Sequence, residues 1–505
     1  MQILPPETVV AVRGKPASAS ESSLARADAA AFVVADRDPA AALSALPHAA
    51  LWQALYRAAR RASKTPLLVA RLPNSRHTLA SVAFLRPGAS AFERLDLAGK
   101  VMHELLKPGV ASLQCHAAGF AADESAAVVE ALASAALAGA AAMPQRKSKP
   151  VPPSDLRRVD VHGGRTADLG RASAVAAGNH LARWLATLPP NELDCLAYKR
   201  ALAALARREG WSFRFYDERA LERLGAGAFL AVARANEHRG AGIARLSYRP
   251  RGAKRARRIG LVGKGICFDT GGINLKAHKS MYLMHGDMQG SAVAVGTLLA
   301  LARSGAPYAI DCWLALTENQ IGPSAYRPQE VVRAMNGTTI QVVHSDAEGR
   351  MVLADTLTLA AREKPALLLD FATLTGACVN ALTDRYSGAF TNSAALEAPL
   401  VAAGRASGER IWCFPMDEDF DAELDSTVAD VLQCTMESKG DHILAARFLN
   451  RFVPKDVPWT HIDLSASERK GGLAHVPTEF TGFGVRFATQ LLADPALFGH
   501  LGSGK

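Results

Sequence analysis

Residues 259–272 read IGLVGKGICFDTGG, in which a short apolar run is followed by a glycine-rich turn that contains Lys264 and Asp269. The run has the length and the β-rich composition of a buried strand. Similar runs alternate with helical patterns downstream. Strands are expected at Ile259 to Val262, Ala309 to Leu316, Ile340 to Val343 and Leu367 to Phe371, and helices at Ser291 to Ala302 and Val352 to Arg362. This alternation predicts an α/β domain with a largely parallel central sheet flanked by helices.

Four carboxylates lie at the ends or edges of these apolar runs. They are Asp269, Asp287, Asp346 and Glu348. Unpaired charge at buried positions costs several kcal/mol, and like charges that gather in one place are tolerated when cations neutralise them. Residues just past strand ends also occupy the usual place for sites in α/β sheets. The four residues therefore predict a divalent-metal site with oxygen ligands.

Several strings of the sequence resemble the leucyl (cytosol) aminopeptidases, two-metal exopeptidases that remove the first residue from peptides. The resemblance runs from about Thr166 to Leu492. Its core strings are LVGKGICFDTGG at 261–272, DMQGSAVAV at 287–295 and HSDAEGRM at 344–351. Further matches are LPPNEL at 188–193, AYRPQEVV at 325–332, ATLTGA at 372–377 and PWTHIDLSA at 458–466.

The resemblance implies a role for individual residues. The metal ligands would be Lys264, Asp269, Asp287, Asp346 and Glu348, and the catalytic positions outside the ligand set would be Lys276 and Arg350. By the same resemblance, Glu348 bridges two metal ions and Asp346 also uses its main-chain carbonyl. An amine ligand such as Lys264 must be neutral to bind, which requires a metal beside it that lowers its pKa. Lys276 is expected to stay charged.

These parts predict a metal-dependent aminopeptidase that hydrolyses the N-terminal residue, Leu-like or broad, from short peptides. A metal-activated bridging water would be the nucleophile, and Lys276 would stabilise the oxygen that gains charge in the transition state. A guanidinium cannot act as a base, and in the family this arginine holds a bicarbonate that shuttles the proton, so we expect the same at Arg350. The expected cofactors are two divalent ions per subunit, Zn²⁺ or Mn²⁺, with Mg²⁺ or Co²⁺ also compatible. The family also implies a homohexamer.

The chain departs from the family pattern in two places. His344 and Ser345 replace the usual Asn-Thr, which changes the hydrogen bonds available to orient the ligands. Residues 465–468 read SASE, where the family commonly has Ala-Gly followed by small or apolar residues. Two orientations of Glu468 are open at this stage. It either faces the pocket for the first side chain of the substrate, where it would attract Lys or Arg, or turns outward and pairs with Arg469 or Lys470.

Length and composition predict two domains. The chain has 505 residues, of which 49% are hydrophobic, enough for more than one core. The segment PQRKSKPVPP at 144–153 has the composition of a linker. We expect an N-terminal α/β domain of unclear function at 1–155 and the dinuclear-metal catalytic domain at 156–505. In the first, strands are expected at Val9 to Val12, Ala31 to Val34, Leu67 to Ala70 and Ser81 to Phe84, and helices at Leu51 to Ser63 and Ser125 to Ala142.

Cysteine usage and the N-terminus predict a cytoplasmic protein without a membrane partner. The seven cysteines form no C-x-x-C motif, which is typical of reduced thiols. The first residues lack a basic segment followed by an apolar core, and no apolar run reaches the length of a membrane span. His278 and His285 lie between the ligand segments, and we interpret both as polar surface residues rather than ligands.

The formal charge of +10 leaves a second function open, a DNA-binding accessory role through basic patches. Candidate phosphate contacts lie at 57–61, 146–149 and 254–258. These runs are short and scattered, and only 6% of the residues are aromatic, so we do not expect nucleic acid as a partner. A third alternative, metal-dependent phosphoester hydrolysis, has less support because no phosphate-cradling loop accompanies the carboxylates.

Overall fold

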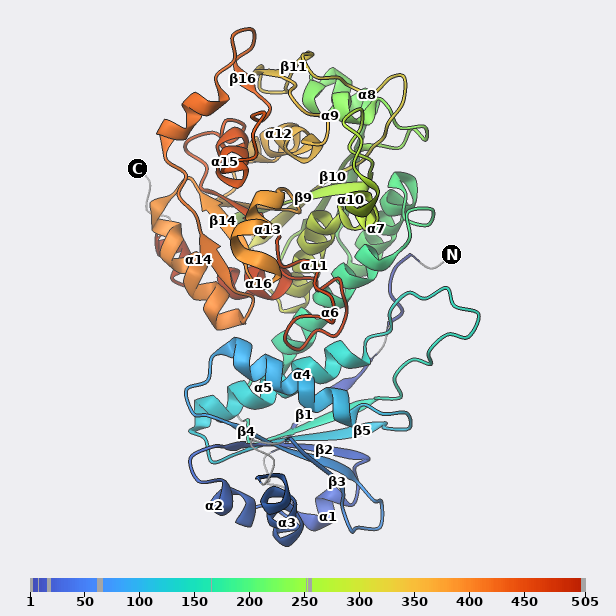
Figure 1. The fold of residues 1–505 in the computed structure, drawn as a ribbon, viewed down its shortest axis with the longest axis vertical. Coiled ribbons are helices and arrows are strands. Elements are labelled where there is room, and N and C mark those ends of the chain that lie inside the picture. Colours follow the sequence, from blue (N-terminus) through green and yellow to red (C-terminus); the bar gives the residue numbers. More distant parts are fainter. Residues whose placement is uncertain are drawn as a thin grey trace.

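Two sheets of different size dominate the computed structural model (Figure 1). The structure describes residues 3–7, 9–15, 20–60, 67–164, 166–250, 252 and 257–500. The smaller sheet lies in the N-terminal part of the chain, and the larger one lies in the C-terminal part. The α/β fold class, with a smaller N-terminal α/β region, is thereby confirmed.

The N-terminal sheet has six strands in the order β1-β6-β5-β2-β4-β3. All neighbouring pairs are parallel except β3 with β4. The strands are β1 (Ala11–Lys15), β2 (Ala29–Ala35), β3 (Leu68–Arg71), β4 (Leu79–Leu85), β5 (Ser112–Ala118) and β6 (Arg158–His162). The four strands expected here overlap β1 to β4.

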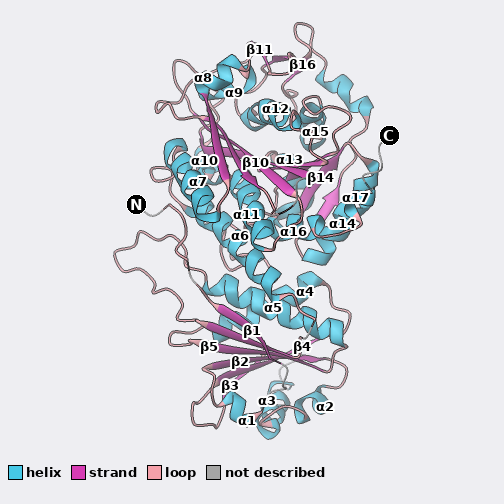
Figure 2. Ribbon diagram, turned by 180° about the vertical axis from the view of Figure 1, so that it is seen from behind, coloured by secondary structure: helices cyan, strands magenta, loops and turns pink. Residues whose placement is uncertain are grey.

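Helices cover both faces of the N-terminal sheet (Figure 2). On one face lie α4 (Ala91–Leu105) and α5 (Ala122–Ala140), and on the other lie α1 (Glu21–Leu24), α2 (Pro39–Ser44) and α3 (Ala49–Arg60). The central strand β2 (AAAFVVA) is apolar along its whole length because both of its faces are buried. Ala31 and Val33 pack into the core on one face of the sheet, and Phe32 and Val34 pack into the core on the other.

The expected helix at 51–63 corresponds to α3, and its residues 61–63 lie outside the described residues. The division at 155/156 stays a prediction, but β6 follows that point in the sequence and still pairs with β1 and β5 of the first sheet. The N-terminal sheet is therefore completed by a strand that comes after the expected linker.

The C-terminal sheet has eight strands in the order β15-β14-β17-β13-β9-β10-β8-β7. They are β7 (Ser212–Asp217), β8 (Gly242–Tyr248), β9 (Arg258–Asp269), β10 (Ala309–Asn319), β13 (Leu367–Ala372), β14 (Ser387–Thr391), β15 (Ile411–Cys413) and β17 (Trp459–Asp463). The central strands β17, β13, β9 and β10 are mutually parallel. β8 and β14 run antiparallel to their central neighbours β10 and β17, and the edge strand β7 runs antiparallel to β8. A largely parallel centre was predicted, and it is confirmed.

Helices again cover both faces of this sheet (Figure 2). One face packs against α6 (Leu169–Thr187), α7 (Cys195–Glu209), α11 (Gln289–Arg303), α14 (Ala394–Ser407), α16 (Val485–Leu492) and α17 (Leu497–His500). The other packs against α9 (Gly227–Ala233), α12 (Glu348–Ala361) and α15 (Asp441–Asn450), with α8 (Glu218–Arg223) alongside. The expected helices at 291–302 and 352–362 correspond to α11 and α12.

One expected central strand lies elsewhere. Residues 340–343 were expected in the main sheet, but β12 (Thr339–Gln341) belongs to a separate three-stranded sheet with β11 (Val331–Arg333) and β16 (Val431–Leu432). The expectation was wrong because a short apolar run has the same pattern in a peripheral sheet as in a central one. The remaining short elements are α10 (His278–Met281), η1 (Met284–Gly286), α13 (Gly376–Leu382), η2 (Thr383–Arg385) and η3 (Glu418–Leu424).

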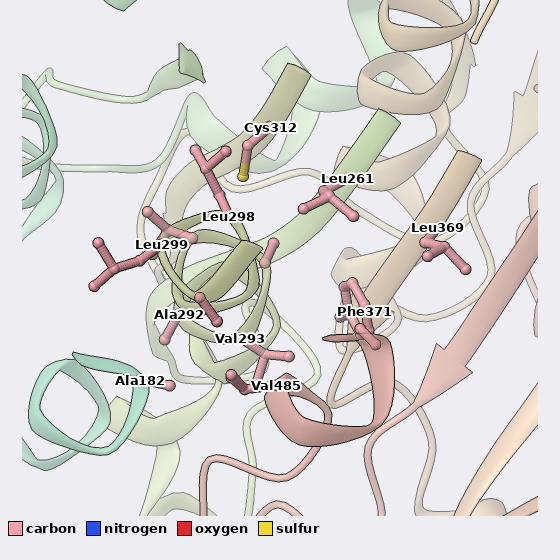
Figure 3. Packing of buried hydrophobic residues seen from close by; sticks show 14 of the residues in the cluster. Ala182, Leu261, Ala292, Val293, Leu298, Leu299, Cys312, Leu369, Phe371 and Val485 are labelled. Carbon is pink, nitrogen blue, oxygen red and sulfur yellow. The ribbon is translucent and has the colours of Figure 1, made fainter. Parts of the chain in front are cut away.

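Helix α11 packs tightly on the central strands (Figure 3). Ala292, Val293 and Leu298 meet Leu261 of β9 and Phe371 of β13 in one buried cluster. The close approach depends on Gly290, because a Cβ atom there would lie 2.1 Å from the carbonyl oxygen of Phe371. The start of α11, and with it Asp287, is thereby held against the ends of the strands.

Among the described residues, no helix combines the length and the apolar character needed to cross a membrane. All seven cysteines are free thiols, and only Cys413 is not fully buried. The prediction of unpaired cysteines is consistent with this arrangement.

Candidate metal centre

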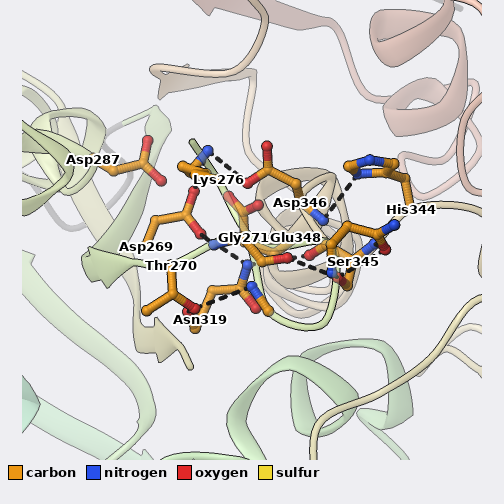
Figure 4. Close-up of polar contacts among 12 residues, drawn as sticks. Asp269, Thr270, Gly271, Lys276, Asp287, Asn319, His344, Ser345, Asp346 and Glu348 are labelled. Atoms are coloured by element: carbon orange, nitrogen blue, oxygen red, sulfur yellow. Dashed lines mark hydrogen bonds and ion pairs between the residues drawn. The ribbon is translucent and has the colours of Figure 1, made fainter. Parts of the chain in front are cut away.

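Segments that are distant in the sequence bring the predicted ligands together near the ends of the central strands. Lys264 and Asp269 belong to β9, Asp287 lies just before α11, and Glu348 is the first residue of α12. All four side chains are buried, with exposed fractions of 1–6%. Asp346, two residues before α12, is partly exposed. Figure 4 shows Asp269, Asp287, Asp346 and Glu348 around Lys276.

Each of two lysines forms ion pairs with two of the four carboxylates. The Nζ atom of Lys264 lies 2.8 Å from Asp287 Oδ1 and 2.8 Å from Glu348 Oε1. The Nζ atom of Lys276 lies 2.9 Å from Asp269 Oδ2 and 2.5 Å from Asp346 Oδ1. Ligand atoms of Asp269, Asp346 and Glu348 all lie within 4.8 Å of one another, a separation suited to a shared metal ion.

The local electrostatics reflect a surplus of buried carboxylates. Burial raises the pKa of Asp287 to about 8, because Lys264 offsets only part of this cost and Glu348 adds repulsion. Burial and the charges of Glu348 and Asp269 raise the pKa of Asp346 to about 6. Burial alone would lower the pKa of Lys264, but Asp287 and Glu348 outweigh it and raise that pKa. A metal that binds the Lys264 amine would therefore have to displace a proton.

Divalent metal fits this set of residues. Asp287 Oδ2 and Glu348 Oε2 are buried atoms without a hydrogen-bond partner among the described residues. Such carboxylate oxygens are costly to leave unpaired, and they are the ligands that hard divalent cations prefer. The donor set around these two atoms therefore suits the metal ions that the sequence predicts.

Surrounding polar groups orient the carboxylates. Asp269 Oδ1 accepts hydrogen bonds from the backbone N–H of Gly271 and from Asn319 Nδ2, both at 2.8 Å. Asp287 Oδ1 accepts a bond of 2.7 Å from the hydroxyl of Thr373. Gly271 has a φ of +87°, and a Cβ there would lie 2.5 Å from the carbonyl of Asn274. This turn therefore requires glycine.

Ser345 joins the two ligand-bearing loops. Its hydroxyl donates to the carbonyl of Gly271 at 2.6 Å and accepts from the backbone N–H of Asn274 at 2.8 Å. Its own carbonyl accepts from the Tyr326 hydroxyl at 2.7 Å. The sequence showed the change at position 345 but did not predict these hydrogen-bond partners. Asn319 lies outside the strings that match the family, and it was not predicted either. Tyr326 and Thr373 lie inside two of those strings, AYRPQEVV and ATLTGA.

Arg350 is buried on α12 and pairs with a residue that sequence reasoning missed. Its Nη2 atom lies 2.8 and 2.9 Å from the two carboxylate oxygens of Asp441, the first residue of α15. Its Nη1 atom donates to the carbonyl of Gln433 at 3.2 Å. Arg350 Nε is buried and without a hydrogen-bond partner among the described residues. The guanidinium of Arg350 is thus already paired with a carboxylate of the same chain, that of Asp441.

One cavity of about 630 Å³ contains the whole set. All seven predicted residues line it: Lys264, Asp269, Lys276, Asp287, Asp346, Glu348 and Arg350. Glu468 also lines it. His278 is exposed on α10, and the ring of His285 packs edge-on against Phe480.

Three residues of the basic patches are engaged in other contacts. Arg146 pairs with Glu192, and Arg258 pairs with Asp311 and Glu363. Arg257 stacks over the ring of Phe498. Residues 61 and 254–256 of the patches lie outside the described residues. These contacts give the DNA-binding alternative no support.

A model of the cytosol aminopeptidase family, catalytic domain, matches residues 180–489. The chain belongs to this family. A probable cytosol aminopeptidase of Afipia carboxidovorans is 38% identical over 336 residues. The match spans 66% of this chain and 66% of that relative, slightly less than two thirds of its length.

Two solved structures resemble the chain beyond the region that the family model matches. Tomato leucine aminopeptidase, solved as a mutant, has a TM-score of 0.84 and 25% identity, and the match covers 97% of this chain and 98% of that chain. The bottromycin maturation enzyme BotP in complex with Mn has a TM-score of 0.79 and 30% identity, with coverage of 92% and 99%. The family fold therefore extends through both sheets.

Proposed function

We propose that the protein is a metal-dependent aminopeptidase that removes the N-terminal residue, Leu-like or broad, from short peptides. One observation carries the proposal: Asp269, Asp346 and Glu348 place ligand atoms within 4.8 Å of one another, in a cavity that also contains Lys276. Membership in the cytosol aminopeptidase family supports the same reaction.

Two divalent ions would be held by Lys264, Asp269, Asp287, Asp346 and Glu348. When bound, such ions polarise the scissile carbonyl and lower the pKa of water so that it attacks near neutral pH. Manganese is supported by the structural relative that was solved with Mn, and zinc stays an alternative because oxygen-and-amine ligands discriminate little between them.

Lys276 would stabilise the transition state through a positive charge that is held in a fixed position. Burial alone would lower its pKa, but the charges of Asp269, Glu348 and Asp346 raise it, so the ammonium stays charged at neutral pH. Asp269 and Asp346 also hold its Nζ atom in place. A preorganised donor aimed at a developing oxyanion contributes more than one that must reorient from solvent.

Arg350 has a less direct part in this proposal. The bicarbonate that the resemblance implies stays a prediction, and it would have to share the guanidinium with Asp441. A cytoplasmic location and a homohexamer also stay predictions. Free, mostly buried cysteines support the location, and the cavity volume suits short peptides rather than folded proteins.

The decisive experiment combines activity with metal content. Protein stripped of metal by a chelator should lose hydrolysis of Leu-anilide and regain it with Mn²⁺ or Zn²⁺. Glu348→Gln should lose both activity and bound metal, measured by elemental analysis, whereas Glu479→Gln, a change at an exposed carboxylate, should retain both. Full activity of the chelated protein would refute the proposal.

A further inference from the structure

Glu468 lies in the wall of the cavity that the proposed metal ligands line. It follows β17 by five residues and forms an isolated antiparallel bridge with Phe480, which fixes its backbone. The side chain is half-buried and lines the cavity together with Asp287 and Glu348. A carboxylate in this position is available to a bound substrate.

The basic residues that follow Glu468 do not neutralise it. Arg469 pairs with Asp384 at 2.6 Å, and Lys470 is exposed. Among the described residues, the carboxylate of Glu468 has no hydrogen-bond or ion-pair partner. Of the two orientations that the sequence left open, outward pairing is therefore not the one observed.

The surroundings of Glu468 favour a cation. Burial raises its pKa, and the neighbouring carboxylate of Glu479 raises it further. A partly desolvated carboxylate beside another acid is stabilised when a positive charge binds to it. An external cation would supply the missing partner.

The lining of the same cavity also includes apolar surface against which a long aliphatic side chain can pack. Leu283, Met284 and Val379 contribute apolar surface to its lining, and Gly376 contributes no side chain at all. Lysine and arginine bury their methylene stems along apolar surface and place the charged group at the end. A substrate with such a residue would use both features together.

We propose that Glu468 makes this site select peptides whose first residue is lysine or arginine. This inference rests on the proposed aminopeptidase function. The ammonium or guanidinium of that residue would pair with Glu468, while its stem lies along the apolar wall. An acidic first residue would be rejected by the same carboxylate.

The test compares N-terminal lysine with norleucine, which has the same four-carbon stem without the ammonium. In the metal-loaded protein, kcat/KM for the lysine anilide should exceed that for norleucine by about tenfold or more, as expected for a charge-assisted contact. Glu468→Gln should abolish this ratio and leave the norleucine rate within about twofold. Glu397→Gln is the matched control, because Glu397 is an exposed carboxylate on α14 that does not line the cavity, and it should preserve the ratio.

The outcomes separate the two proposals. If norleucine and leucine anilides are cleaved but lysine has no advantage, or if Glu468→Gln lowers both rates equally, the inference about Glu468 is wrong and the aminopeptidase function stands. If no anilide is cleaved by the metal-loaded protein, the proposed function itself fails. Unchanged metal content in Glu468→Gln, measured in the same preparations, would show that a selective loss does not arise from a damaged centre.

Discussion

The guanidinium of Arg350 donates hydrogen bonds to both carboxylate oxygens of Asp441, at 2.8 and 2.9 Å, inside the cavity that the predicted metal ligands line. Arg350 is almost fully buried, and a buried guanidinium requires an anion to offset its desolvation. Here the anion is part of the chain. A dissolved anion at Arg350 would therefore have to compete with Asp441.

Removal of Asp441 should change how the protein responds to added bicarbonate. Bicarbonate would compete with Asp441 for Arg350, so the bicarbonate concentration that gives half-maximal activation in carbonate-free buffer should be lower for Asp441→Ala than for the wild type. Asp441→Ala should be slower and should recover several-fold with bicarbonate, while Asp441→Asn tests the charge without a change in shape. Equal half-activating concentrations in the two proteins would contradict this expectation.

Loss of the Lys276 ammonium should reduce turnover without loss of metal. Lys276→Met is expected to lower kcat by about two to three orders of magnitude, the scale for one oxyanion stabiliser. Lys279→Met is the control, since Lys279 is exposed on the neighbouring helix α10. Steady-state kinetics with parallel metal analysis would check the prediction, and equal small effects from both variants would show that Lys276 has no such role.

The Ser345 hydroxyl should influence metal affinity although it is not an expected ligand. Ser345→Ala removes its bonds to Gly271 and Asn274, in the turn that follows Asp269. Groups that orient ligands typically contribute tenfold to hundredfold to metal affinity, so the dissociation constant should rise by about that factor. Ser345→Thr retains the hydroxyl and should stay near wild type. An unaltered affinity in Ser345→Ala would refute the positioning role.

A buried acid away from the metal centre should couple stability to pH. Burial raises the pKa of Asp355 on α12 from 3.8 to about 7, although backbone N–H groups, including those of Met335 and Phe229, partly offset it. The folded state thus binds more protons than the unfolded state between about pH 4 and 7, so this group lowers stability as pH rises through that window. The Tm of Asp355→Asn relative to wild type should therefore rise from pH 4 to 7. If the difference in Tm between the two proteins does not change with pH, the pKa of Asp355 lies near its ordinary value.

The sequence placed the candidate carboxylates at the ends of apolar elements, and the structure agrees with that placement: Asp269 ends β9, and Glu348 begins α12. Their role as metal ligands stays a prediction. Asp441 was not predictable in this way, because its contact with Arg350 joins residues 91 positions apart and depends on how α15 packs on α12. The placement of β12 failed for a similar reason, since an apolar run specifies a strand but not its neighbours.

The Ser345 junction also limits how this sequence can diverge. The Ser345 hydroxyl links the Gly271–Asn274 turn to the segment before α12 by hydrogen bonds. The backbone positions of the two loops are therefore coupled. An insertion or deletion in either loop would shift Asp269 against Asp346 unless the other loop compensated. Variation of loop length is therefore expected elsewhere on the domain surface, and residues 274 and 345 should behave as a unit whose members are exchanged together.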